Sequence, residues 1–475
     1  MNRKQRRADA KSGAQQAPSP PSPEHLLYSA ALGHYQAGRY AQAQPLLLHM
    51  ISANPRDHDA LNLLGAIAFE TLPLEVAEDF FHRALAVRPN ESTAHCNLGN
   101  ALHHQAKYTE ALPSLRRAVR LSPHSREALV SLGHTLRALG QLDEAIAAYR
   151  KAVALDPQSA EAHYALSTAL LTQGDFTAGW QEHEWRWQTS HLCAARLEFV
   201  QPQWRGEAAP GKTLLIYDEQ GFGDSLQFCR FVPLAAAQGL RVILSVPPGL
   251  LSLFKSLPGV DHLVTHGNPL PDFDLHCPMM SLPLAFGTTL ETIPDSIPYL
   301  HADPQAIADF QSRLGPATGK RIGLVWAGNP RKEQRLFTLI DSRRSIDATL
   351  LAPLFEIPGA QFISLQKAGP AAPAHFPLTD LMPDVQDFAG TAALIANLDL
   401  VICVDSSVAH LAGALGKPLW LLDRYDHCWR WLAGRSTSPW YPAMRIYRQK
   451  SPGDWRGVIS EVSRHLQSFS AQDKS

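Results

Sequence analysis

The sequence predicts an α-helical repeat solenoid followed by a pair of doubly wound, parallel α/β domains. Two observations support this α plus α/β class. In the first third of the chain, prolines return every 34 residues, which is typical of stacked helical hairpins. From about residue 211, short apolar runs alternate with amphipathic stretches, which is typical of parallel strands covered by helices.

The repeat is defined by its prolines and by residues at fixed distances before them. The prolines are Pro55, Pro89, Pro123 and Pro157. A small residue of each first helix is paired with a bulky residue of the second helix: Ala31 with Leu47, Gly65 with Phe81, Gly99 with Leu115, and Gly133 with Tyr149. The small residue lets the two helices approach, and the bulky one fills the remaining gap. This pattern resembles the tetratricopeptide repeat (TPR), with four full repeats over about 24–157.

A fifth repeat begins at Gln158 and then departs from the pattern. Gly179 replaces the alanine of the second helix, and Trp180, Trp185 and Trp187 follow. These aromatic residues predict a last helix that docks onto the next domain. Stacked repeats leave a concave groove, so we expect a peptide or protein partner there. The alternative is that the repeats serve only as a spacer or a dimerisation arm.

Charge and cysteine content exclude some classes of partner. Lys and Arg total 43 and Asp and Glu total 44, so no net charge attracts nucleic acid. No apolar run approaches the ~18 to 20 residues of a transmembrane helix. The six cysteines are sparse and lie outside metal-ligand spacings, which favours a reducing cytoplasm. Residues 1–22 are basic and then rich in Ser, Gln, Ala and Pro, which predicts a disordered tail.

The second half of the chain contains two alternating sets of strands and helices. The expected strands are 213–217, 241–246, 262–265 and 273–276 in the first set, and 322–326, 361–366, 398–404 and 417–422 in the second. A terminal helix at about 453–468 could cross back onto the first sheet. The predicted domains are therefore a tail (1–22), a solenoid (23–190), a first α/β half (191–315) and a second, donor-binding half with a closing helix (316–475). Such a tandem places a crevice between the carboxyl ends of two sheets, where nucleotides bind.

The first candidate motif is Gly221-Phe222-Gly223-Asp224, between a strand and a helix. Gly221 and Gly223 allow the backbone to approach a ligand closely, and the helix N-terminus favours negative charge on that ligand. A carboxylate in this loop could act as a general base. The alternative is a simple turn in which Asp224 caps the helix.

The second motif is the loop Asp405-Ser406-Ser407 and the helix that it opens. Backbone N–H groups from Ser406 to Val408 would point at a diphosphate, and the helix dipole would add to the attraction. His410 lies in the first turn, where it could hydrogen-bond a phosphate or a sugar hydroxyl. A packed core histidine is the alternative.

The third motif is a strand-end turn, Gly328-Asn329, followed after a polar loop by Arg343 and Arg344. The forked arginine side chain suits phosphate. Lys367, at the end of the next strand, could neutralise a phosphate. Surface exposure of these cations is the alternative interpretation.

The stretch from about 213 to 450 resembles the heptosyltransferase-like glycosyltransferases of family 9, which have two Rossmann-type halves in the GT-B architecture. The matching segments are Gly221-x-Gly223-Asp224, Ser256 to Val260, Ile322 to Trp326 and Asp405 to Ala412. With repeats in front, the arrangement is similar to protein O-GlcNAc transferases. The resemblance implies inverting, metal-independent transfer of a sugar from a nucleotide-diphospho-sugar, with no cofactor besides this donor. It makes Asp224 the candidate base and the 405–410 loop the donor-phosphate site.

The sequence departs from the family pattern in two places. Ser407 stands where the donor loop often carries glycine, and the stretch 331–341 is long and unusually apolar. No histidine matches the one expected in the first half of O-GlcNAc transferases, so no acceptor is implied. The alternative functions are an inactive repeat adaptor that mediates protein–protein interaction, and a sugar-nucleotide epimerase.

Overall fold

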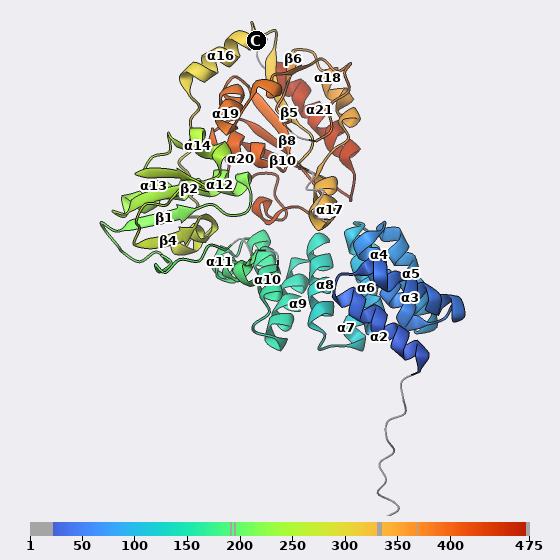
Figure 1. Ribbon diagram of the computed structural model, residues 1–475. Coiled ribbons are helices and arrows are strands. Elements are labelled where there is room, and N and C mark those ends of the chain that lie inside the picture. The colour runs from blue at the N-terminus through green and yellow to red at the C-terminus, as the bar shows by residue number, and fades with distance from the viewer. Residues whose placement is uncertain (1–21, 191, 194–195, 330–334, 368, 472–475) are drawn as a thin grey trace, which may run out of the picture. The chain divides into compact units, whose positions relative to one another are not determined.

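The computed structural model describes the chain apart from residues 1–21, 191, 194–195, 330–334, 368 and 472–475, so the predicted tail lies almost entirely outside the described residues (Figure 1). The chain divides into two compact units, 1–123 and 124–475. The first is helical, and the second joins further helices to two parallel sheets. The predicted α plus α/β class is confirmed. The finer domain boundaries stay a prediction.

The first unit consists of three helical hairpins. Its helices are α2 (Pro23–Gln36), α3 (Tyr40–Ala53), α4 (His58–Thr71), α5 (Leu74–Val87), α6 (Ser92–His104) and α7 (Tyr108–Leu121). Helices α3, α5 and α7 each end two residues before the repeat proline, because the residue preceding proline is restricted to extended backbone. Asp57 caps α4 by accepting a hydrogen bond from the backbone N–H of Ala60 at 3.0 Å.

The predicted pairing of small and bulky residues is confirmed. A Cβ added to Gly65 would lie 2.5 Å from Cε1 of Phe81, and one added to Gly99 would lie 2.4 Å from Cγ of Leu115. The glycines therefore mark the places where the two helices of a repeat touch. Ala31 and Leu47 are both fully buried in the core of the first hairpin.

The second unit begins with the last two repeats. Its first elements are α8 (Arg126–Ala138), α9 (Leu142–Leu155), α10 (Ala160–Gln173), α11 (Phe176–His183) and the 3-10 helix η1 (Glu184–Gln188). Trp180 is 2% exposed, and its ring lies 5.4 Å from that of Trp429 and 6.5 Å from that of Trp440, both near the end of the chain. The predicted docking of the last repeat helix is thus confirmed.

A buried ion pair also ties η1 to the first sheet. The fully buried guanidinium of Arg186 contacts both carboxylate oxygens of Glu219, with Nε to Oε2 and Nη2 to Oε1 both 2.7 Å. Ser281 and Glu184 accept its remaining N–H groups. Because unpaired buried charge is costly, this complete set of partners fixes the position of η1.

The first sheet has the strand order β3-β2-β1-β4, with all neighbours parallel. Its strands are β1 (Thr213–Tyr217), β2 (Arg241–Val246), β3 (His262–Thr265) and β4 (Leu275–Pro278), and its helical segments are α12 (Phe222–Phe228), η3 (Cys229–Phe231), α13 (Val232–Ala237), α14 (Pro248–Phe254), η4 (Met279–Ser281) and α15 (Leu282–Ala285). The continuous helix expected after β1 is broken in three. Pro233 in the first turn of α13 explains the break, because it lacks an N–H and clashes with the preceding turn.

The second sheet has the order β10-β9-β8-β5-β6-β7, also parallel. Its strands are β5 (Lys320–Val325), β6 (Ala360–Ser364), β7 (Leu378–Asp380), β8 (Leu400–Val404), β9 (Leu419–Asp423) and β10 (Met444–Arg448), and its helical segments are α16 (Pro304–Leu314), α17 (Arg335–Arg344), η5 (Ala348–Leu351), α18 (Ala352–Phe355), η6 (Met382–Asp384), α19 (Phe388–Ala396), α20 (Ser407–Ala414), η7 (Trp429–Trp431) and α21 (Trp455–Ala471). Strand order reverses between β5 and β8 and between β1 and β4. In open α/β sheets, ligands bind beside such points.

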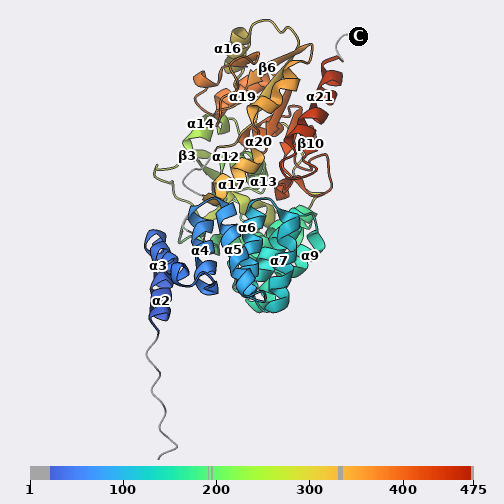
Figure 2. The same ribbon diagram turned by 90° about the vertical axis from the view of Figure 1, so that its right-hand side faces the viewer.

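The expectation that the terminal helix crosses back onto the first sheet is wrong. Helix α21 packs on α18, η5 and β10, all in the second half (Figure 2). Its Phe469 lies 5.9 Å from the ring of Trp420 on β9. The apolar face of the helix is therefore buried against the sheet that it follows in the chain.

Candidate functional site

The structure brings the first two sequence motifs together. Helix α12, after β1, packs directly against α20, after β8 (Figure 1). A Cβ on Gly223 would lie 2.9 Å from Cδ2 of His410 and 3.6 Å from Cα of Ser407. Glycine at position 223 is thus required for the approach of the two helix N-termini, which lie at the carboxyl ends of strands from different sheets.

Asp224 lies in the first turn of α12, with both carboxylate oxygens engaged. Oδ2 accepts the backbone N–H of Gly221 at 2.8 Å, so the capping role considered from the sequence is present. Oδ1 accepts from the guanidinium of Arg430 in the loop after β9. A carboxylate has about four lone-pair sites, so capacity for an acceptor hydroxyl remains.

Arg430 is a candidate site residue that the sequence interpretation missed. Its Nε donates to Oε1 of Gln227 at 2.7 Å, and its guanidinium lies over the ring of Trp429 at 4.4 Å. The flanking tryptophans, in Trp429-Arg430-Trp431, were the available signal. Nothing in a single sequence shows that this segment faces a glycine loop about 200 residues earlier.

The candidate donor loop has a buried hydroxyl at its centre. Ser406 is the N-cap residue of α20 and makes no side-chain capping bond, and its buried Oγ has no hydrogen-bond partner among the described residues. Val408 is 8% exposed, and Asp405 and Ser407 are partly exposed. The expectation that the N–H groups of this turn point at a diphosphate stays a prediction.

His410 is a packed core histidine, which is the second of the two alternatives that the sequence left open, and its predicted hydrogen bond to a phosphate or a sugar hydroxyl stays a prediction. It is 5% exposed and stacks on Trp431, and its Nδ1 lies 2.9 Å from the hydroxyl of Tyr441. Burial, reinforced by Arg430 and Arg230, lowers the pKa of His410 well below its ordinary value. The imidazole is therefore neutral near pH 7, and it can offer a hydrogen bond but not a positive charge.

The predicted loop before Arg343 and Arg344 is wrong, because both residues lie in the last turn of helix α17, where a cation is favoured by the helix dipole. Arg344 pairs with Asp341 at 2.7 Å and donates to the carbonyl of Asp405 at 3.1 Å. Arg343 lies 3.2 Å from Asp426. Arg344 thus contacts the donor loop, and each arginine lies beside a carboxylate.

The turn after β5 is fixed by the same helix. A Cβ on Gly328 would lie 2.0 Å from Oδ1 of Asp341, and the N–H of Gly328 donates to Oγ of Ser345 at 3.1 Å. Asn329 is exposed. Gln366, which was not singled out from the sequence, binds this turn through the backbone N–H of Trp326 at 3.0 Å.

The contacts of Lys367 do not join it to the residues around the donor loop. Its ammonium donates to the backbone carbonyls of Met382 and Val385, in the segment between β7 and α19. These bonds give Lys367 a structural role in holding that segment. Its predicted part in binding a phosphate has no support from the hydrogen bonds that it makes.

Asp423, at the carboxyl end of β9, is a titratable group of unusual burial. It is fully buried and pairs with Arg448 at 2.7 Å. Burial, which Arg448 opposes and Asp405 reinforces, raises the pKa of Asp423 to about 7. Within the described ranges, no group of three or more His, Cys, Asp or Glu side chains is arranged to hold a metal ion.

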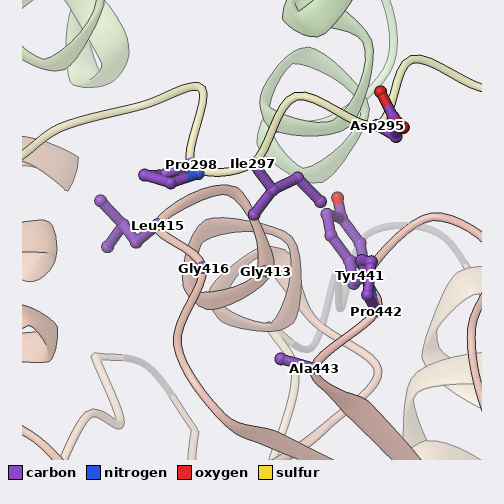
Figure 3. A pocket seen from close by; sticks show the side chains of 9 residues that line it. All are labelled: Asp295, Ile297, Pro298, Gly413, Leu415, Gly416, Tyr441, Pro442 and Ala443. Atoms are coloured by element: carbon purple, nitrogen blue, oxygen red, sulfur yellow. The ribbon is translucent and has the colours of Figure 1, made fainter.

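A separate hollow of about 260 Å³ lies behind the site. It is formed by the linker around Ile297 and Pro298, the carboxyl end of α20 and the segment Tyr441 to Ala443 (Figure 3). The linker is held there because the N–H of Tyr299 donates to the carbonyl of Ala414 at 3.1 Å. Tyr441 therefore separates this hollow from His410.

Sequence comparisons agree with both parts of the chain. Residues 28–78 and 74–126 match the tetratricopeptide repeat, and 133–174 match the TPR repeat. Residues 369–422 match glycosyltransferase family 9 (heptosyltransferase). This last segment includes β8, the donor loop and His410.

Individual relatives resemble the chain over part of its length. Protein FlbA of Caulobacter vibrioides is 27% identical over 335 residues, which is 64% of this chain and 54% of FlbA, so the chain spans about half the length of this curated relative. A crystal structure of MamA is 19% identical, covering 35% of this chain and 97% of MamA with a TM-score of 0.31. Pseudomonas aeruginosa pilF is 18% identical, covering 37% of this chain and 78% of pilF with a TM-score of 0.33. Such TM-scores do not by themselves define a shared fold.

In the described part of the chain, no helix has both the length and the apolar character that crossing a bilayer requires. The matches to the repeat and glycosyltransferase models show that the chain joins tetratricopeptide repeats to a glycosyltransferase-like α/β region in a single polypeptide.

Proposed function

We propose that the protein is an inverting, metal-independent glycosyltransferase that moves a sugar from a nucleotide-diphospho-sugar to an acceptor hydroxyl. The observation that carries this proposal is the approach of the Gly221–Asp224 turn to the Ser406–His410 turn across the crevice. One turn supplies a carboxylate and the other supplies N–H groups suited to phosphate. The match of 369–422 to glycosyltransferase family 9 supports the same class of reaction.

In the proposed reaction, Asp224 accepts the proton of the acceptor hydroxyl as its oxygen attacks the anomeric carbon. The bond from that carbon to the diphosphate breaks, and the nucleoside diphosphate leaves. The guanidinium of Arg430 holds the Asp224 carboxylate in place through the hydrogen bond to Oδ1. The acceptor reaches the carboxylate from its open side, because Gly221 and Arg430 occupy only part of its lone-pair capacity.

The leaving diphosphate carries the charge that the other half must stabilise. The N–H groups of the first turn of α20 and the hydroxyl of Ser406 would donate hydrogen bonds to the phosphate oxygens, and His410 would donate another as a neutral imidazole. Arg343 and Arg344 would add positive charge for the phosphates. To bind these two guanidinium groups, the phosphates would have to compete with the carboxylates of Asp426 and Asp341. No resident cofactor is needed in this scheme.

The base assignment is tested by Asp224→Asn. We expect transfer to fall by at least about 100-fold, because an amide cannot accept the proton, while nucleotide binding stays nearly unchanged. Thermal-shift titration with nucleoside diphosphates measures binding, and release of nucleoside diphosphate from a panel of nucleotide sugars measures turnover. Unchanged turnover in the variant would remove Asp224 from the base role.

The repeats are proposed to recruit a protein partner or a protein acceptor, since stacked tetratricopeptide repeats present a groove for peptide segments. The second candidate function is a binding adaptor with an inactive α/β region. The observation that favours it is that both carboxylate oxygens of Asp224 already accept a hydrogen bond within the protein, from Gly221 and Arg430. A wild-type protein that binds no nucleotide or nucleotide sugar in the thermal-shift screen would support the adaptor.

A further inference from the structure

We propose that Arg430 is a positioning residue, which fixes the first turn of α12 in the crevice and is itself held in place by the last repeat. This inference rests on the proposed transferase function. Arg430 acts through Asp224 and does not itself bind the substrate.

Arg430 recognises one face of α12. Its Nη2 donates to Asp224 and its Nε to Gln227, and its guanidinium lies 6.0 Å from the ring of Phe228. These residues are spaced i, i+3 and i+4, so they lie on the same side of the helix. A single side chain from the second half therefore sets both the rotation of α12 and the direction of the Asp224 carboxylate.

The forked edge of the guanidinium formed by Nε and Nη2 is already occupied within the protein, by Gln227 and Asp224. Its Nη1 donates to Sγ of Cys428 at 3.4 Å, while Trp429 covers one face at 4.4 Å. The side chain is 11% exposed. An arginine that binds phosphate through two parallel hydrogen bonds needs a free forked edge of its guanidinium. The contacts of Arg430 instead fit a group that orients a neighbouring carboxylate.

The loop that carries Arg430 is supported by the fifth repeat. The N–H of Ala433 donates to the carbonyl of Thr172 near the end of α10 at 3.1 Å, and α10 packs on η7. Trp429 also packs edge-on against Trp180 of α11. On the repeat side of this contact, Thr172 and Trp180 are both 2% exposed, so a shift of the loop would disturb buried packing. The divergent fifth repeat is thus a support for the candidate site.

Tyr164 of α10 also lies close to this arrangement. Burial raises the pKa of Tyr164, and the nearby charges of Arg430, Arg186 and Asp224 also act on it. Its ring is 5.6 Å from that of His183, which is 1% exposed. The charged pair therefore has aromatic and imidazole neighbours from α10 and α11, which exclude water from that side.

The test compares Arg430→Gln and Arg430→Lys with Arg445→Gln, a matched control on β10 whose exposed arginine contacts His465. The first measurement is binding of UDP, GDP, CDP and ADP by calorimetry. The second is the steady-state release of nucleoside diphosphate from the nucleotide sugar that the wild type uses. We expect Arg430→Gln to lower kcat by roughly 100-fold, because a misplaced base loses its alignment with the acceptor. The Kd of the diphosphate and the KM of the donor should change less than about threefold.

Arg430→Lys keeps the charge but loses the fork to Gln227, so it should recover part of the lost kcat. Gln227→Leu removes only the second partner and should lower kcat by a smaller factor, again at unchanged KM. If Arg430→Gln does not fold, Gln227→Leu tests the positioning role of Arg430 in its place. A loss of diphosphate affinity that parallels the loss of kcat would make Arg430 a phosphate ligand and overturn the proposal. Wild-type kcat in both Arg430→Gln and Gln227→Leu would overturn it as well.

Failure of the proposed function has a different signature. In that case the wild type itself shows neither diphosphate binding nor turnover. Amide hydrogen exchange over 221–228 then decides the inference. Faster exchange in Arg430→Gln than in Arg445→Gln supports a positioning role, and equal exchange in the two variants overturns it.

Discussion

The last repeat of the second unit continues the 34-residue spacing of the repeats in the first unit. Its second helix, however, is buried against a different partner. In the first unit, the bulky residue of each second helix packs onto a small residue of its own hairpin, as Leu115 does on Gly99. In the fifth repeat, Trp180 packs on Trp429 and Trp440 of the α/β region. The same helical hairpin is therefore self-contained in one place and part of a larger core in the other.

The largest expected effect comes from Trp180→Ala. Removing a side chain that is 2% exposed leaves a large cavity in the shared core, so we expect a loss of about 3–5 kcal/mol in the free energy of unfolding. Urea denaturation followed by tryptophan fluorescence and circular dichroism measures it. Trp185→Ala is the matched control, since Trp185 is only partly buried and its ring stacks on that of His163, so its removal should cost about 1 kcal/mol. Equal losses in the two variants would mean that the last repeat does not depend on the α/β core.

A smaller effect is expected from Gly99→Ala in the first unit. The new Cβ would lie 2.4 Å from Cγ of Leu115, so the hairpin must open and should lose about 1–3 kcal/mol. Gly33→Ala is the control with the opposite sign. It lies inside α2 with no atom within 4 Å of the added Cβ, and it should gain up to about 1 kcal/mol from helix propensity. A Gly99→Ala protein as stable as Gly33→Ala would contradict the packing scheme.

The smallest expected effect concerns pH and is confined to the second unit. Asp423 has a folded pKa of about 7, above its unfolded value of 3.8, so the folded state holds the proton more tightly. Its contribution to stability is present at low pH and is lost as the pH rises toward 7. Between pH 6 and pH 8, the wild type should lose about 1 kcal/mol relative to Asp423→Asn. The asparagine oxygen can still accept the bond from Arg448.

Urea denaturation at several pH values checks this prediction. The Asp57→Asn variant, which alters a helix cap in the first unit, should keep the wild-type pH dependence over the same range. An Asp423→Asn protein with the same pH dependence as the wild type would show that the buried carboxyl group stays charged.

Local sequence signals were sufficient for the repeats and for most strands. The 34-residue spacing predicts the hairpins, and the strands 213–217, 241–246 and 262–265 have the predicted bounds. The short edge strands β7 and β10 were not predicted, because edge strands carry weaker apolar patterns and take their structure from a neighbour. The sequence predicts a loop where helix α17 lies, because the contacts of this helix depend on a tertiary neighbour, the turn at Gly328.

The candidate site shows the same division. Glycine-rich turns and the Asp405–His410 segment could be recognised from residue types alone, and the structure places them against each other. Arg430 and Gln366 could not, because each acts on a backbone or side chain distant in sequence. The partners of Lys367 could not be predicted either, because the sequence does not distinguish a lysine that donates to two backbone carbonyls from one that binds phosphate.

The buried pair of Arg186 and Glu219 has a practical consequence for protein engineering. A chimaera that takes its repeats from another protein and joins them at residue 190 would lose Arg186 and leave the buried Glu219 without the cation that it pairs with. A junction after Pro123 keeps Trp180, Arg186 and the whole second unit intact. Because of this ion pair, repeats should be exchanged at a junction well before the end of the last repeat.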